Sequence, residues 1–252
     1  MQGDITLTES SSERVKAGIS TPITYYYTAA MSHQGELEYI NIFQCLNDKY
    51  SGRILQPEFF VVAEQSNRIF ALNRKLIEEA IAQARKKPIY RFVVALSTKW
   101  FEKENMIEDI KTLLSCAPEN IVFSITATSL ANVSPSGKEA LTKAILDYSL
   151  KLLLDNPEEE KLSVLFDYKL TYIRLDGRYY ASGSSVKSAY LRIYADYARS
   201  QSIRVVVQNV QTDDEKNFFY KAGLSLMEGK IICSPKTKVN AIISPYEMKN
   251  SN

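Results

Sequence analysis

The sequence has few of the side chains that most often bind metals or form disulfides. It contains one histidine, His33, and three cysteines, Cys45, Cys116 and Cys233, which are far apart in the chain. An odd number of scattered cysteines, with no C-x-x-C pair and no neighbouring histidine, gives no sign of a disulfide framework or a zinc motif. We therefore expect reduced thiols in a cytoplasmic protein.

Long apolar runs and an excess of one charge are also missing. No stretch approaches the roughly 20 apolar residues that span a bilayer, and Met1 to Ser12 is polar and acidic rather than basic and then apolar. The formal net charge of +2 creates no overall field that would attract nucleic acid or an anionic membrane. The sequence thus predicts no membrane span, no export and no nucleic acid polymer as a partner.

Internal repeats, low-complexity tracts and long linkers are absent as well. At 252 residues, of which 45% are hydrophobic, the chain is long enough to bury one large core. We expect a tail or linker over residues 1–20, rich in Ser, Thr and Glu, one barrel domain over residues 21–245, and a short exposed tail over residues 246–252.

What the sequence does contain is an alternation of β-rich runs and runs of helical period, which is typical of a parallel sheet with crossover helices. Two apolar stripes at helical spacing are expected to face the core. They are Leu141, Ala144, Ile145, Tyr148 and Leu152 in one helix, and Val186, Ala189, Tyr190, Ile193, Tyr194 and Tyr197 in another. Eight strands are predicted, a number that suits a barrel: Ile23 to Ala29, Leu37 to Leu46, Tyr90 to Leu96, Ile121 to Thr126, Leu162 to Tyr168, Tyr172 to Asp176, Ile203 to Val207 and Lys230 to Cys233.

Several landmarks follow one another in an order that resembles a known family. The segment from Gly52 to Ser66 is similar to G-x-I-x-P-x-E-F-I-P-x-A-E-x-S-G, with the proline displaced by one place. Further along, Val94 to Ser97 resembles V-N-L-S, Phe123 to Thr126 resembles L-E-I-T, Arg174 to Asp176 resembles K-I-D, and Val207 to Thr212 resembles A-E-G-V-E-T. Between about Ile23 and Pro235 the chain thus resembles the EAL domain family, the (β/α)8-type phosphodiesterases that hydrolyse the bacterial second messenger cyclic di-GMP. The resemblance implies an α/β fold with an EAL-type, TIM-like barrel.

The resemblance also implies a catalytic site with two divalent metals about 4 Å apart, which need several carboxylate ligands. At the matched positions this chain departs from the family. Asn41 stands where the family has the glutamate of E-A-L, Ala95 replaces the metal-binding asparagine, and Ser124 replaces the next glutamate. Arg174 takes the place of the catalytic lysine, and Glu228 that of the closing glutamine.

Two further motifs are altered in the same way. The two glutamates of E-G-V-E-T are matched by Gln208 and Gln211, which are uncharged. The paired aspartates of L-D-D-F are matched to Leu165-Phe166-Asp167-Tyr168, where Asp167 alone remains. One carboxylate against four positive charges leaves no credible dimetal site, so we expect neither a metal nor any other cofactor.

These departures predict a degenerate EAL domain, a pseudoenzyme that works by contact with an unknown protein partner as an adaptor, antagonist or regulatory module. The alternative is a non-catalytic cyclic di-GMP receptor with a residual site at Asp167, Arg174, Gln208 and Gln211. It is disfavoured because an anionic Glu228 would repel phosphate and Cys45 replaces a phosphate-binding arginine of the family. A third reading is a hydrolase whose metal ligands have moved, which predicts other carboxylates at the barrel mouth.

One interval does not fit an ordinary barrel. Asp167 and Asp176 are nine residues apart, whereas the family has about twenty between its paired aspartates and K-I-D. Parallel neighbours need a crossover of about a dozen residues or more. The sequence therefore predicts either an irregular strand or a barrel remodelled between residues 162 and 180, together with an altered homodimer.

Three other features have simple structural explanations. His33, beside Gln34-Gly35, is expected to be a solvated turn residue rather than a catalytic base. The run from Ser182 to Ser185 is expected to cap a helix, because it lacks the lysine spacing of a phosphate-binding loop. The cations and tyrosines that alternate from Arg174 to Arg199 are expected to form a solvated face and a core rather than a nucleic acid surface.

Overall fold

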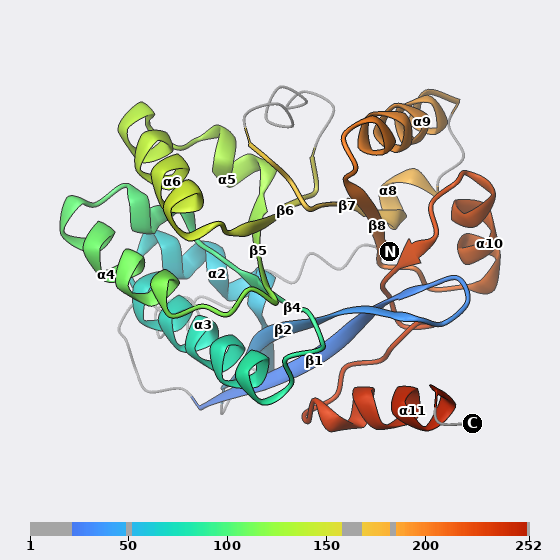
Figure 1. The fold of residues 1–252 in the computed structure, drawn as a ribbon, viewed down its shortest axis with the longest axis horizontal. Helices are drawn as coiled ribbons and strands as arrows, with labels where there is room; N and C mark the ends of the chain where they lie inside the picture. Colours follow the sequence, from blue (N-terminus) through green and yellow to red (C-terminus); the bar gives the residue numbers. More distant parts are fainter. Residues whose placement is uncertain (1–21, 49–51, 158–167, 182–184, 251–252) are drawn as a thin grey trace.

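The fold is taken from a computed structural model, which describes residues 22–48, 52–157, 168–181 and 185–250 (Figure 1). The predicted tail over residues 1–20, most of the predicted strand Leu162 to Tyr168, and the run Ser182 to Ser184 lie outside these residues. No helix in the described ranges combines the length and apolarity needed to cross a membrane.

Eight strands close into a barrel. The first, β1 (Ile23–Ser32), runs antiparallel to both of its neighbours, β2 (Leu37–Asp48) and β9 (Leu226–Met227). Between them follow parallel strands in chain order, β4 (Phe92–Ala95), β5 (Ile121–Thr126), β6 (Lys151–Asp155), β7 (Tyr172–Asp176) and β8 (Arg204–Gln208). A further strand, β3 (Gly52–Leu55), pairs with β2 outside the ring. The predicted (β/α)8-type barrel is confirmed, with its first strand reversed.

Helices surround this barrel and connect its parallel strands (Figure 1). The longer ones are α2 (Gln56–Gln65), α3 (Ile69–Lys86), α4 (Glu104–Ser115), α6 (Pro135–Tyr148), α9 (Ser185–Ser200), α10 (Asp213–Lys221) and α11 (Asn240–Asn250). Short turns α5 (Ala127–Ala131), α8 (Gly177–Tyr180) and the 3-10 helix η1 (Thr98–Phe101) follow strands β5, β7 and β4. A sequence signal marks the start of α10, where Thr212 and Glu215 form a capping box. Helix α11 continues past residue 245, into the tail that was predicted over residues 246–252.

The barrel interior is filled by side chains from every strand. One buried cluster contains Ala30, Tyr39, Val93, Val122, Leu153, Tyr172, Val206 and Leu226, one residue from each of the eight strands. Because side chains alternate across a strand, residues two places further along the parallel strands also point inward, one layer nearer the mouth. The apolar layer therefore supports a second inward layer at the carboxyl ends of the strands.

One barrel strand was not predicted, and one predicted strand is wrong. The barrel contains β6 at Lys151–Asp155, although Leu152 was expected on a helix. The helix before it, α6, ends at Tyr148 and is followed by Ser149 in the left-handed conformation, with φ of 49°. The short apolar run Leu150 to Leu154 fits a helix and a strand equally well by periodicity, which explains the error. The last barrel strand is Leu226–Met227 and not Lys230 to Cys233.

The strand that the sequence analysis missed, β6, also resolves the interval that did not fit an ordinary barrel. The parallel neighbour of β7 is β6, and residues 156–171 connect them, which is long enough for an ordinary crossover. The strand order across this part of the barrel is regular. Remodelling of the barrel around residues 162–180 is therefore not found in its strand order.

The predicted core face of α9 is partly wrong. The helix buries Leu191, Tyr194, Ala195 and Ala198 against the barrel, and Tyr190 and Tyr197 are partly buried. Val186 and Ile193 instead have 59% and 51% of their surface exposed. The apolar surface of this helix is therefore wider than the area that the barrel covers.

Candidate functional site

Most of the positions singled out from the sequence lie at one end of the barrel. Asn41 on β2, Ala95 on β4, Ser124 on β5, Arg174 on β7, Gln208 on β8 and Glu228 directly after β9 each follow, by two residues, a member of the buried interior layer. They therefore form the next inward layer, at the carboxyl ends of the parallel strands. We call this layer the barrel mouth; it is where enzymes with this architecture carry their catalytic groups.

Arg174 lies at the centre of this layer and is almost fully buried, with 7% of its surface exposed. Its guanidinium donates from Nε to Oδ1 of Asp155 at 2.9 Å and from Nη2 to Oδ2 of the same carboxylate at 2.6 Å. It also donates from Nη2 to Oγ of Ser124 at 3.3 Å and from Nη1 to Oε1 of Glu228 at 3.4 Å. The planar fork of arginine thus binds one carboxylate in a bidentate manner and reaches a second one.

Two neighbours on β2 complete the surroundings of Glu228, which is itself buried, with 6% of its surface exposed. Its Oε1 accepts a hydrogen bond from the hydroxyl of Tyr39, and its Oε2 accepts one from Nδ2 of Asn41 at 3.0 Å. Burial, followed by the negative charge of Glu228, raises the pKa of Tyr39 well above its usual value. Both oxygens of the Glu228 carboxylate therefore accept hydrogen bonds from protein donors.

The two neighbouring carboxylates, Asp155 and Glu228, favour the charged form of Arg174. Burial alone would lower its pKa, but the charges of Asp155 and Glu228 more than compensate and hold the pKa well above the usual value. The described part of the barrel mouth therefore carries one buried cation between two buried or half-buried carboxylates.

Asp155 is the site residue that the sequence analysis missed. It ends β6 and is followed by Asn156 and Pro157, whereas the aspartate predicted for this strand, Asp167, lies outside the described residues. Asp155 precedes Asp176 by twenty-one residues, close to the family spacing of about twenty. The signal that could have found it is this spacing, together with an Asn-Pro turn after an apolar run.

A second group of polar side chains lies on the rim. Nε2 of Gln208 donates to Oδ1 of Asn156 at 2.7 Å, and Asp176 accepts from Arg178 and from Nδ2 of Asn209, the latter at 3.1 Å. Burial raises the pKa of Asp176, but the hydrogen bonds from Arg178 and Asn209 outweigh it, so the net pKa is lowered. The exposed side chain of Gln211 reaches this rim only through the backbone, because its Nε2 donates to the carbonyl oxygen of Asn209 at 3.2 Å.

Metal ligands are sparse among these residues. In the ranges that the structure describes, no group of three or more His, Cys, Asp or Glu side chains is placed to hold one metal ion. The reading with relocated ligands predicted carboxylates at the mouth, and Asp155 is one such group. Its oxygens, however, already accept from Arg174.

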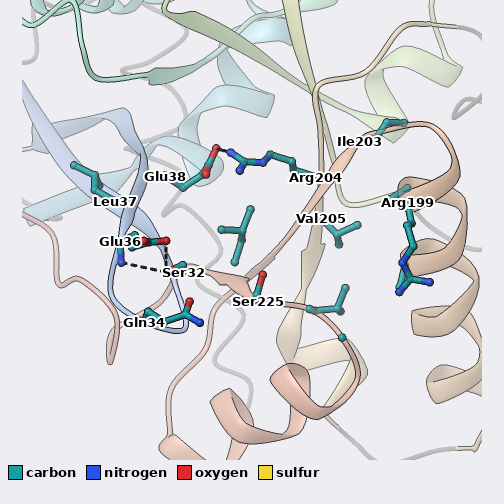
Figure 2. A pocket seen from close by; sticks show the side chains of 15 residues that line it. Ser32, Gln34, Glu36, Leu37, Glu38, Arg199, Ile203, Arg204, Val205 and Ser225 are labelled. Carbon is teal, nitrogen blue, oxygen red and sulfur yellow. Dashed lines mark hydrogen bonds and ion pairs between the residues drawn. The ribbon is translucent and has the colours of Figure 1, made fainter.

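A cleft of about 560 Å³ opens at the opposite, amino-terminal end of the barrel (Figure 2). Its wall includes Glu38 at the start of β2 and Arg204 at the start of β8, which form an ion pair. Glu38 also accepts from Arg91 at 2.9 Å and from the hydroxyl of Tyr172. The lining carries two carboxylates, Glu36 and Glu38, and two guanidiniums, Arg199 and Arg204, so the cleft shows no single-sign field that would select a charged ligand.

The sequence and the fold point to the same family. The family model described as "EAL domain" matches residues 16–235, which is most of the chain. The chain belongs to the EAL domain family. No curated protein is significantly similar to this EAL domain in sequence.

Solved structures show the same barrel. The EAL domain superimposes on a MucR phosphodiesterase in complex with c-di-GMP with a TM-score of 0.73 and 15% identity, covering 84% of this chain and 91% of that one. An EAL domain protein from Listeria monocytogenes gives a TM-score of 0.75 and 12% identity, with 95% and 96% covered. The EAL domain of FimX from Pseudomonas aeruginosa, bound to c-di-GMP, gives 0.73 and 14%, with 90% and 94% covered. At these identities the likeness concerns the fold alone.

Proposed function

We propose that this EAL domain is catalytically inactive and acts as a protein-interaction or regulatory module in bacterial cyclic di-GMP signalling. The observation that carries the proposal is the position of Arg174, whose buried guanidinium binds Asp155 and Glu228 at the barrel mouth. A permanent cation takes the carboxylates that a metal would need. The chain itself thus supplies a cation that faces both carboxylates of the mouth.

The side chains of the mouth do not fit a pair of divalent metals. Such metals prefer several anionic oxygens, and their combined charge has to be offset by carboxylates. Asn41, Ser124 and Gln208 supply neutral oxygens, and Ala95 supplies none from its side chain. A metal would have to displace Arg174 from its two carboxylates, which would leave a buried arginine without partners.

Arg174, which stands at the lysine position of the family's K-I-D motif, also argues against catalysis. An arginine stays protonated at all physiological pH values and cannot exchange a proton with a reacting water. In this chain the surrounding carboxylates strengthen that tendency, because they raise the pKa of Arg174 further. A role in proton transfer is therefore unfavourable at this position.

A non-catalytic cyclic di-GMP receptor is the second candidate. It is favoured by the amide side chains on the rim, Gln208, Asn156 and Asn209, which could bind a nucleotide, and by relatives solved with c-di-GMP. It is disfavoured because the guanidinium that would contact a phosphate is buried with carboxylates, and Glu228 adds a negative charge. We therefore place protein contact first.

A hydrolysis assay tests the proposal. The purified protein is incubated with cyclic di-GMP and Mg²⁺ or Mn²⁺, and the nucleotides are separated by chromatography, with an active EAL phosphodiesterase as the positive control. We expect no linear product above the background of a reaction without protein. Turnover that requires the metal and disappears in Asp155→Asn would overturn the proposal. Binding without turnover would support inactivity and assign the receptor role.

A further inference from the structure

Helices α8 and α9 present apolar side chains to solvent on one side of the barrel. Tyr179, Val186 and Ile193 have 44%, 59% and 51% of their surface exposed, and Ala189 between them is exposed as well. Val186, Ala189 and Ile193 are three and four residues apart, so they lie on one side of α9. We call Tyr179 of α8 together with Val186, Ala189 and Ile193 of α9 the α9 face; Figure 1 shows α9 at the outer edge of the molecule.

The α9 face is not needed to attach the helix to the barrel. That contact is made by Leu191, Tyr194, Ala195 and Ala198, which are all buried. Covering exposed apolar side chains such as Val186 and Ile193 removes their surface from water, so this row offers binding energy to a partner. Because other residues attach the helix to the barrel, substitutions in the α9 face are expected to leave the fold intact.

Cations surround the apolar strip. Helices α8 and α9 contain Arg178, Lys187, Arg192 and Arg199 against two carboxylates, Asp196 on α9 and Asp176 directly before α8, which pairs with Arg178 at 2.6 Å. Arg199 pairs with Asp196 at 2.9 Å, and Nζ of Lys187 lies 3.9 Å from the centre of the Tyr179 ring. Within the part of the chain that the structure describes, Arg192 makes no ion pair and is exposed. The surroundings of the strip are thus positively charged on balance.

We propose that the α9 face is the docking surface for an acidic amphipathic helix of a partner protein. The inference rests on the proposed function, because it names the surface by which the domain would make protein contact. Apolar side chains of the partner would cover Val186 and Ile193, while its carboxylates would face Arg192 and Lys187. Charge complementarity of this kind directs association and selects against basic partners.

Two other occupants fit the surface less well. A second copy of the chain would bring the same excess of cations against itself, which is repulsive. A nucleic acid strand would use stacking on aromatic rings, whereas Val186, Ala189 and Ile193 are aliphatic and one side of the Tyr179 ring is covered by Lys187. The partner is therefore expected to be both apolar and acidic.

Two synthetic peptides of equal length serve as probes. Both have leucines at the i, i+3, i+4 and i+7 positions of a helix; one carries glutamates beside this stripe and the other lysines. Binding to the full chain is followed by fluorescence anisotropy of the labelled peptide. We expect the glutamate peptide to bind at least about tenfold more tightly than the lysine peptide, and added salt to weaken it.

Substitutions on the domain locate the binding surface. Ile193→Glu and Arg192→Glu are each expected to weaken the glutamate peptide by about tenfold, since one removes an apolar contact and the other reverses a charge. The matched control is Leu146→Glu on α6, because Leu146 is also an exposed apolar residue, with 73% of its surface accessible. Leu146→Glu should leave the affinity for the glutamate peptide unchanged. Circular dichroism melting checks that each variant is folded.

Four results would overturn the inference. They are equal binding of the two peptides, equal losses in Leu146→Glu and Ile193→Glu, self-association in ultracentrifugation that Ile193→Glu abolishes, and binding of a single-stranded oligonucleotide that Arg192→Glu abolishes. Hydrolysis of cyclic di-GMP is measured separately. Turnover together with peptide binding would remove the proposed inactivity and keep the docking surface, so the two failures can be told apart.

Discussion

Arg174 connects two carboxylates that come from different strands of the barrel. Asp155 ends β6 and Glu228 follows β9, and both bind the same guanidinium. A buried arginine with two carboxylate partners holds those strand ends in one arrangement, because any separation would leave a charge unpaired in a region of low polarity. The residue therefore has a structural effect that is independent of any ligand.

Replacing Arg174 should show the size of this effect. We expect Arg174→Met to lower the free energy of unfolding by about 3–5 kcal/mol, because Asp155 and Glu228 lose their partner. The matched control is Arg178→Met, whose exposed pair with Asp176 should contribute less than about 1 kcal/mol. Urea unfolding followed by circular dichroism measures both. Similar small losses in the two variants would show that the buried pair has no special role.

Tyr172 should make stability depend on pH in the alkaline range. Burial, followed by the hydrogen bond to Glu38 and the charge of Glu38, raises the pKa of Tyr172 to about 12. In the unfolded chain the ordinary pKa is about 10, so the unfolded state loses its proton first as the pH rises. The stabilising contribution is complete below pH about 10 and is lost as the pH approaches about 12.

Thermal melting between neutral and strongly alkaline pH tests this expectation. The wild-type protein should lose stability in that window more steeply than Tyr172→Phe, which cannot ionise at this position. Tyr26→Phe serves as the control, since Tyr26 lies on β1 and stacks against Phe43 outside this cluster. Parallel curves for the wild type and Tyr172→Phe would contradict the assignment.

At the scale of the elements, backbone contacts hold the ends of β8 and β9 close together. The amide of Glu228 donates to the carbonyl of Val207 at 2.8 Å, and the amide of Val210 donates to the carbonyl of Glu228 at 2.9 Å. Gly229 follows with φ of 150°, and a Cβ there would lie 2.1 Å from the carbonyl oxygen of Val210. Only glycine allows this approach, which sets the position of Glu228.

A pair of alanine substitutions separates crowding from backbone conformation. Gly229→Ala should cost at least about 3 kcal/mol, because the strand end has to move away from Val210. Gly223→Ala should cost about 1 kcal/mol, since Gly223 also has positive φ, of 86°, but no atom within 4 Å of an added Cβ. Thermal and urea unfolding compare the two. Equal costs would mean that the junction adapts and does not fix Glu228.

At the scale of the whole molecule, the barrel followed from the alternation of elements and the order of the landmarks. The matched positions Asn41, Ala95, Ser124, Arg174, Gln208 and Glu228 all occupy one inward layer, because each resemblance carried its strand register with it. Periodicity is strongest where strands are flanked by clear breaks, such as Pro118 before β5. These parts of the account could be derived without the structure.

The errors came from places where local pattern is ambiguous. The run from Leu150 to Leu154 is too short to separate strand from helix, so Asp155 was missed and the aspartate motif was sought around Asp167. On α9, two apolar stripes overlap, and periodicity alone cannot say which of them faces the barrel. The network around Arg174 was also out of reach, because it joins residues that are far apart in sequence.

The central claim is that Arg174 occupies the place of metal at the barrel mouth. Isothermal titration of Mn²⁺ into the wild-type protein and into Arg174→Met, in the presence of cyclic di-GMP, tests it most directly. We predict no saturable binding to the wild type up to millimolar metal, and measurable binding to Arg174→Met, where Asp155 and Glu228 lose their cation. Tight, stoichiometric binding of two metal ions to the wild-type protein would contradict it.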